Sequence, residues 1–253
     1  MPNSSSSDQS GSSAAGSGTQ PLSSHGLLNP DTFCERPIFM EIGLNEQLLR
    51  GVFTRCSDIV FRTFTIFGAR KALLLYVDGL IDSKELEENI LKPLTTAEGS
   101  TMYGQQSTIA FLQEVVLPIG STETVDTLPR VVNMVLRWQG LLLIDGETKA
   151  LALSVSGWPQ RAVAEPQTEA VIRGPREAFT ENVRTSTALI RRRIHTPDLK
   201  MESMQIGRYT QTQVVLCYIE NLASPNLIKE VKERLSRIEI DAVLESGYIE
   251  ELI

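Results

Sequence analysis

Apolar and polar residues recur with helical or strand periods from about residue 37 onward, and these periods predict most of the secondary structure. The first apolar residues recur at helical spacing and predict a helix, for which Asn45 is the predicted N-cap. The next two apolar runs, 59–66 and 71–77, predict a pair of strands. The apolar residues of the first helix are Leu48, Leu49, Val52, Phe53 and Cys56.

A capping signal follows the second predicted strand. Asp82 has Glu85 three residues later, a pattern in which each side chain satisfies a free backbone N–H of the helix start. This predicts a short helix over 83–92. Pro93 is expected to end it, because proline lacks the N–H that a helix interior needs.

The middle of the chain contains its clearest hairpin. Loops around one helix near 105–116 are expected over 95–127, and a further helix over 128–139. Two apolar runs within 141–155 then flank the turn at Gly146-Glu147. Because both runs are apolar almost throughout, helices are expected to cover both faces of this hairpin.

The last third opens on a predicted helix over 175–194. Gly174-Pro175 is a suitable start, since proline at the first helical position loses nothing. Glu177 and Glu181 fall early and the arginine triplet 191–193 falls late, so the charges oppose the helix dipole.

Four elements complete the predicted secondary structure. Strands are expected near 199–207 and 212–219, and an amphipathic helix over 225–239. The tail, 241–253, predicts a short final helix.

This order of elements predicts a mixed α/β (α+β) fold with two small subdomains, each a mixed sheet with flanking helices, separated by a cleft. Residues 1–36 are rich in serine and glycine and are expected to be disordered. The N-terminal subdomain is expected over 37–157 and the C-terminal one over 158–253. Clefts between domains are common sites for small ligands.

Composition excludes some functions. The formal net charge of −7 argues against nucleic acid as the main partner, because phosphate binding favours a basic surface. The three cysteines, Cys34, Cys56 and Cys217, form no Cys-x-x-Cys pair and favour a reducing compartment over a zinc site or a disulfide framework. No apolar run reaches the roughly 18 residues that cross a bilayer, and no signal peptide follows Met1, so this chain is expected to be soluble.

Catalytic constellations are not found either. The phosphate-binding, dinucleotide-binding, zinc-protease and serine-hydrolase motifs are all absent from the sequence. A histidine base would have to be His195, for which a position at a helix C-terminus is the simpler interpretation. We therefore expect no enzyme, no cofactor and no metal site.

Several ordered segments carry a resemblance to a known family. They are KALLLYVDGLID at 71–82, LLLIDGETKALAL at 141–153, EPQTEAVIRGPREAFTENVRT with LIRRRI between 165 and 194, the strand at 214–221, and SPNLIKEVKERLSRIEIDAVLESGYIEELI at the C-terminus. The chain resembles the N-terminal hydrophilic domain of the spore germinant receptor A-subunit family over roughly residues 40–253.

The resemblance implies a receptor subunit of the spore inner membrane that acts with germinant receptor B and C subunits. It also implies that a membrane-spanning region follows Ile253 in the intact protein. The leading hypothesis is that this domain senses a small nutrient (an amino acid, sugar or nucleoside), or transmits its signal, and so triggers germination. The alternative is an assembly module that binds no small molecule; a freestanding binding protein is the third interpretation and is disfavoured.

The predicted ligand site lies near the junction of the two subdomains. A guanidinium group suits a nutrient carboxylate and a glutamate suits an ammonium group. Interdomain ion pairs are the alternative role for the same side chains. The candidates are Arg161, Glu165, Glu169, Arg173, Arg176 and Glu181.

Overall fold

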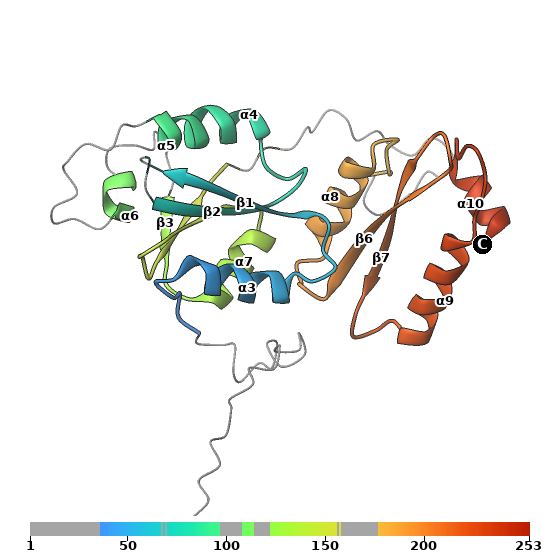
Figure 1. Ribbon diagram of the computed structural model, residues 1–253, viewed down its shortest axis with the longest axis horizontal. Helices are drawn as coiled ribbons and strands as arrows, with labels where there is room; N and C mark the ends of the chain where they lie inside the picture. The colour runs from blue at the N-terminus through green and yellow to red at the C-terminus, as the bar shows by residue number, and fades with distance from the viewer. Residues whose placement is uncertain are drawn as a thin grey trace, which may run out of the picture.

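The computed structural model describes residues 36–66, 68, 70–96, 108–113, 122–155, 157 and 177–253 and has the predicted mixed α+β class (Figure 1). We call β1–β5 with α3–α7 and η1 the five-stranded unit, and β6, β7, α9 and α10 the two-stranded unit. Helix α8 lies between them (Figure 1). The elements are α3 (Ile42–Val52), β1 (Ile59–Ile66), β2 (Arg70–Val77), α4 (Ser83–Glu85), η1 (Leu86–Leu91), α5 (Lys92–Thr96), α6 (Thr108–Phe111), β3 (Thr122–Val125), α7 (Leu128–Leu136), β4 (Gly140–Ile144), β5 (Ala150–Leu153), α8 (Val183–Arg193), β6 (Leu199–Ile206), β7 (Thr212–Ile219), α9 (Pro225–Ser236) and α10 (Ser246–Leu252).

The large sheet has the strand order β1-β2-β4-β5-β3. Its ladders, and that of β6 with β7, are all antiparallel, whereas the prediction was of mixed sheets. Short connections explain the ladders of β1 with β2, β4 with β5 and β6 with β7, because a tight turn can join neighbouring antiparallel strands and parallel ones need a long crossover. The ladders of β2 with β4 and β3 with β5 join strands that are not consecutive in the chain. Strand β3 lies in the region where only loops and a helix were predicted.

Alternate residues of the central strands fill two different cores. On β2, Leu73 and Leu75 pack with α3 and α7, whereas Ala72 and Leu74 pack with η1 and α5. All residues of β4 and β5 are buried. The prediction that helices cover both faces of the 141–155 hairpin is therefore confirmed (Figure 1).

Asn45 does not cap the first helix. Helix α3 begins three residues earlier, and Asn45 lies buried inside it, where its side chain accepts from Phe39 N (2.9 Å) and donates to Phe39 O (2.7 Å). The free N–H of Ile42 donates to the side chain of Asp145 instead (3.1 Å). The side chain of Asn45 thus holds the backbone of the segment that precedes α3.

Pro93 does not end the helix that Asp82 begins. The Asp82 side chain accepts from the N–H groups of Lys84 and Glu85, which is one half of the predicted capping pattern. The N–H of Asp82 donates to Val155 O (3.1 Å) and not to the Glu85 side chain. The helix then widens into the π segment η1 and continues through α5 to Thr96. Pro93 is the second residue of α5 and directly follows the π segment, where the regular hydrogen bonding of the α-helix is already interrupted.

Helix α8 begins at Val183 rather than at Pro175, which lies outside the described residues. Asn182 caps it by accepting from Arg184 N (2.9 Å) and Thr185 N (3.4 Å). Glu177 is therefore not in the first helical turn. It accepts from Arg193 (2.7 Å) and from Arg192, which holds the preceding segment beside the last turn.

The two-stranded unit has a small core. Ile206, Leu235 and Val243 form one buried apolar cluster in it, and α9 covers one side of the β6–β7 pair (Figure 1). A two-stranded sheet is marginal alone and depends on helix packing. The unit therefore depends on α9 and α8.

Arg191 anchors α8 to the five-stranded unit. Its side chain is 0% exposed, and Nε and one terminal nitrogen donate to the two oxygens of Asp58 at 2.6 and 3.0 Å. The two terminal nitrogens also donate to the carbonyls of Thr196 (2.8 Å) and Leu199 (2.9 Å). The arginine triplet was interpreted only as a favourable helix end; its first member joins the two units.

The backbone reinforces this junction. Cys56 forms a parallel bridge with Met201 of β6. Met201 N donates to Arg55 O (2.8 Å), and Ser57 N donates to Met201 O (2.9 Å). The turn before β1 is therefore joined to the small sheet by one isolated bridge and these two hydrogen bonds.

Two expectations stay predictions. Residues 1–35 lie outside the described part of the chain, so the disorder expected for 1–36 is untested there, as is a division at 157/158. Among the residues that the structure describes, no helix combines the length and apolar character needed to cross a membrane.

We predict that Arg191→Ala lowers the free energy of unfolding by roughly 3–5 kcal/mol, because it leaves the buried Asp58 carboxylate without its partner. Arg193→Ala is the matched control from the same turn: its side chain is 50% exposed, and such a pair contributes at most about 1 kcal/mol. Urea unfolding of both variants measures the difference. Equal, small losses would show that Arg191 does not anchor the helix.

Candidate functional site

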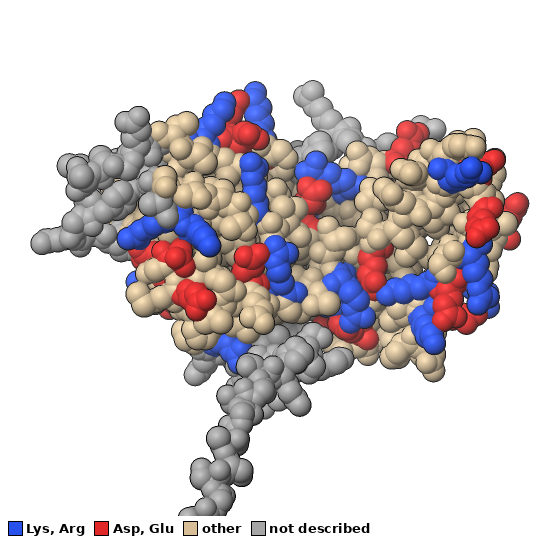
Figure 2. All heavy atoms as spheres, viewed as in Figure 1, with Lys and Arg blue, Asp and Glu red and all other residues tan. Residues whose placement is uncertain are grey.

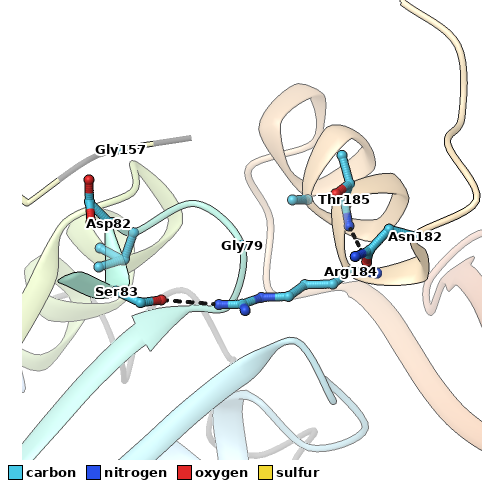
Figure 3. A pocket seen from close by; sticks show the side chains of 9 residues that line it. Gly79, Asp82, Ser83, Gly157, Asn182, Arg184 and Thr185 are labelled. Carbon is cyan, nitrogen blue, oxygen red and sulfur yellow. Dashed lines mark hydrogen bonds between the residues drawn. The ribbon is translucent and has the colours of Figure 1, made fainter. Parts of the chain in front are cut away.

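A cavity of about 410 Å³ lies where the start of α8 meets the loop from β2 to α4 (Figure 3). It therefore opens between the five-stranded unit and α8, in the region where the interdomain cleft was expected. The residues that line it are Gly79, Ile81, Asp82, Ser83, Gly157, Asn182, Arg184, Thr185 and Ala188.

Two helix starts border this pocket. Asp82 Oδ1 accepts from the N–H groups of Lys84 (2.9 Å) and Glu85 (3.1 Å), and Asn182 caps α8 in the same way. Helix N-termini carry partial positive charge, which favours negative groups nearby. The carboxylate of Asp82 already offsets part of that charge at the start of α4.

Arg184 reaches across the pocket from α8 to the five-stranded unit. Its guanidinium group contacts Asp78 Oδ1 at 2.5 Å. It also donates to Ser83 Oγ at 3.4 Å (Figure 3). The side chain is 49% exposed, so water and small solutes reach it. An arginine offers five N–H donors in a planar fork, more than these two contacts use.

Two glycines permit the close approach of the pocket walls. A Cβ atom at Gly79 would lie 3.1 Å from Ala188 Cβ and 3.1 Å from Arg184 O, and the residue has a φ of +80°. A Cβ at Gly157 would lie 2.5 Å from Asp82 Cβ. A larger residue at Gly79 would push α8 away from the loop between β2 and α4, and one at Gly157 would push the segment after β5 away from Asp82.

The pocket combines a guanidinium group, a carboxylate, two hydroxyls and an amide with the apolar side chains of Ile81 and Ala188. This mixture suits recognition of a small polar molecule by hydrogen bonds. Within the described residues, no three His, Cys, Asp or Glu side chains are grouped to hold a metal ion.

Of the six predicted site residues, only Glu181 lies within the part of the chain that the structure describes. Glu181 is exposed, directly precedes the Asn182 cap, and is not among the lining residues. The other five lie outside the described residues, so whether they share a site is untested; they are Arg161, Glu165, Glu169, Arg173 and Arg176.

Sequence reasoning missed the polar groups that line the pocket. Asp82 was recognised only as a helix cap, and Asn182 was passed over because Pro175 was preferred as the helix start. The preference of asparagine for the cap position was the available signal. Nothing in the sequence indicated that Arg184 would face Asp78, since the two residues are far apart along the chain.

Residues 47–253 match the family model described as Bacillus/Clostridium GerA spore germination protein. The chain is 34% identical over 225 residues to spore germination protein KA of Bacillus subtilis (strain 168), covering 87% of this chain and 40% of that protein. It is 37% identical over 219 residues to the uncharacterized membrane protein YfkQ of the same organism, covering 87% and 42%.

A solved structure is also similar. The crystal structure of the N-terminal domain of the A subunit of the Bacillus megaterium spore germinant receptor GerK3 matches with a TM-score of 0.67 and 30% identity. The match covers 86% of this chain and 80% of that one. By contrast, the chain spans about two fifths of the length of the curated relatives just named.

We predict that Gly79→Ala destabilises the protein more than Gly146→Ala does. Both glycines have positive φ (+80° and +85°), which costs other residues about 1–2 kcal/mol, but nothing lies within 4 Å of a Cβ at Gly146. Contact with α8 should add about 1–3 kcal/mol at Gly79. Urea unfolding of both variants measures the added cost, and equal losses would mean that α8 is not packed tightly on this loop.

Proposed function

The chain belongs to the Bacillus/Clostridium GerA spore germination protein family, and from this premise we propose that it is the N-terminal domain of a germinant receptor A subunit that senses a small nutrient. The names of its relatives support a role in spore germination. Binding, rather than catalysis, is the proposed activity of this domain.

The observation that carries this proposal is the pocket between the five-stranded unit and α8. A nutrient that contacts both walls would favour one relative position of the two units over another. A ligand shifts such an equilibrium by its difference in affinity for the two positions. The proposed signal is this shift, which the two-stranded unit would transmit toward the part of the protein that follows in longer relatives.

The predicted junction residues enter the proposal through their place in the sequence. All of them except Glu181 lie between Gly157, which lines the pocket, and Glu177, which is paired with the end of α8. Arg173 is proposed to hold a nutrient carboxylate, as a guanidinium fork does. The remaining candidates are proposed to complete the polar contacts or to tie the units together by ion pairs.

The assembly around this domain is part of the same proposal. We expect the intact protein to lie in the spore inner membrane and to act with germinant receptor B and C subunits. A multi-subunit receptor of this kind is consistent with relatives that are named as receptor subunits.

An assembly module without a ligand is the second candidate. Large apolar side chains are exposed on the two-stranded unit, including Leu222 (81% exposed) and Leu244 (76%). Tyr209, Leu227 and Leu252 are exposed on the same unit. Contiguous exposed apolar patches mark surfaces that other proteins cover, and this second candidate proposes that these side chains form such a surface.

Ligand-observed NMR with a panel of amino acids, sugars and nucleosides tests the sensor proposal. We expect saturable binding of one nutrient class, weakened about tenfold or more (about 1.4 kcal/mol) by Arg184→Gln. The melting temperature should hardly change, since a half-exposed ion pair contributes at most about 1 kcal/mol. Arg173→Ala in parallel separates recognition, which leaves the melting temperature unchanged, from an ion pair between the units, which lowers it.

Arg130→Gln is the matched control. Arg130 is exposed to a similar extent, pairs with Glu123 at 2.7 Å, and is not among the residues that line the pocket. Equal weakening by Arg130→Gln and Arg184→Gln would exclude this pocket as the site. No binding by any nutrient would favour the assembly module.

A further inference from the structure

A second cavity, of about 570 Å³, lies where the turn before β1 meets the side of α9. It shares no lining residue with the pocket of Figure 3. Figure 2 shows basic and acidic side chains next to one another along the lower right of the molecule, where α9 runs in Figure 1. This cavity therefore sits in a highly charged part of the surface.

Positive charge exceeds negative charge among the residues that line it. Arg55, Lys229 and Lys232 contribute three cations, and Glu220 and Glu233 contribute two carboxylates. The excess stands out in a chain with a formal net charge of −7. A cavity with this balance favours an anionic ligand.

The deeper carboxylate is shared by two cations. Glu220 pairs with Arg55 and also with Lys200, whose Nζ lies 3.2 Å from it. Lys200 is 2% exposed, and burial lowers the pKa of its ammonium group. Lys200 is a buried cation, and the carboxylate with which it pairs also pairs with Arg55. A second anion nearby would therefore stabilise its charge.

Arg55 is held in place by the junction of the two units. Its φ of +62° is unusual for a residue other than glycine, and its carbonyl accepts from Met201 N at 2.8 Å. Its guanidinium group donates to Tyr218 Oη at 3.2 Å as well as to Glu220. The fork therefore has a fixed position before any ligand arrives, which lowers the entropic cost of binding.

The two lysines of α9 differ in how firmly they are held. Lys232 donates to both oxygens of Glu202 (2.7 and 2.6 Å), and Tyr218 donates to the same carboxylate. Burial and this hydrogen bond raise the pKa of Tyr218 to about 12, so it keeps its proton. Lys229 is 76% exposed and lies 3.6 Å from Glu233, an arrangement that contributes little and leaves its ammonium group available.

We propose that this cavity binds a small organic carboxylate, held between the guanidinium group of Arg55 and the ammonium group of Lys229. The apolar side chains of Pro225 and Ile228 line the same cavity and would contact the carbon chain of the ligand. Since Arg55 belongs to the five-stranded unit and Lys229 to α9, such a ligand would connect the two units at a second place.

Titration of the ¹⁵N-labelled chain with succinate and with L-leucine tests this assignment, and succinamide serves as the uncharged counterpart of succinate. We expect saturable chemical-shift changes confined to residues near 55 and 220–233 with at least one of the carboxylates and none with succinamide. Lys229→Gln should weaken binding about tenfold, because a lost hydrogen bond to a charged group costs about 1.5–3 kcal/mol.

Arg234→Gln is the control from the same helix, because Arg234 forms an exposed pair with Glu230 (2.8 Å) and does not line the cavity. Its effect should stay below about twofold. Equal weakening by both variants, or no saturable shift with either carboxylate, would overturn the proposal. Arg184→Gln tests the other pocket and should leave this titration unchanged, so the two sites succeed or fail independently.

Discussion

Arg191 extends from α8 into the five-stranded unit, and each of the three nitrogens of its buried guanidinium fork donates to a carboxylate or carbonyl oxygen. A buried ion pair gives up the hydration of both charges, so it is tolerated only where its hydrogen bonds are complete. Completing them requires the start of β1, the end of α8 and the start of β6 to lie together. The position of the small sheet relative to the large one therefore depends on Asp58 and Arg191.

Both proposed binding sites follow from that junction. At one end of α8, Arg184 faces Asp78 across the pocket. At the other side of the junction, Arg55 lies beside Met201 and opens onto the cavity along α9. One cavity lies between the five-stranded unit and α8, and the other lies between the turn before β1 and α9. A ligand in either would therefore connect the five-stranded unit to an element that follows it in the chain. The buried pair of Arg191 holds the units together, whereas the pair of Arg184 is half-exposed. This junction therefore suits small changes in the angle between the units better than their separation.

The periodic parts of the chain were predicted correctly. Strand β1 has the predicted bounds, β2, β6 and β7 differ from theirs by at most a residue, and the hairpin of β4 and β5 is buried on both faces. Errors arose where one residue type serves two purposes. Asparagine caps helices, yet Asn45 supports the chain inside α3 while Asn182 caps α8. Proline is a sound first residue of a helix, but Pro175 did not mark the first residue of α8.

The amino-acid sequence by itself determined the class of the fold, the order of most elements and the membership of the family, because apolar periodicity and ordered resemblance are properties of neighbouring residues. Only the tertiary structure decided which charges are buried and which face one another. Arg191 and Arg193 are two residues apart in one helical turn, yet one is enclosed and the other half-exposed. That difference depends on what packs against each side of α8, and the partner of Arg191, Asp58, is 133 residues away along the chain.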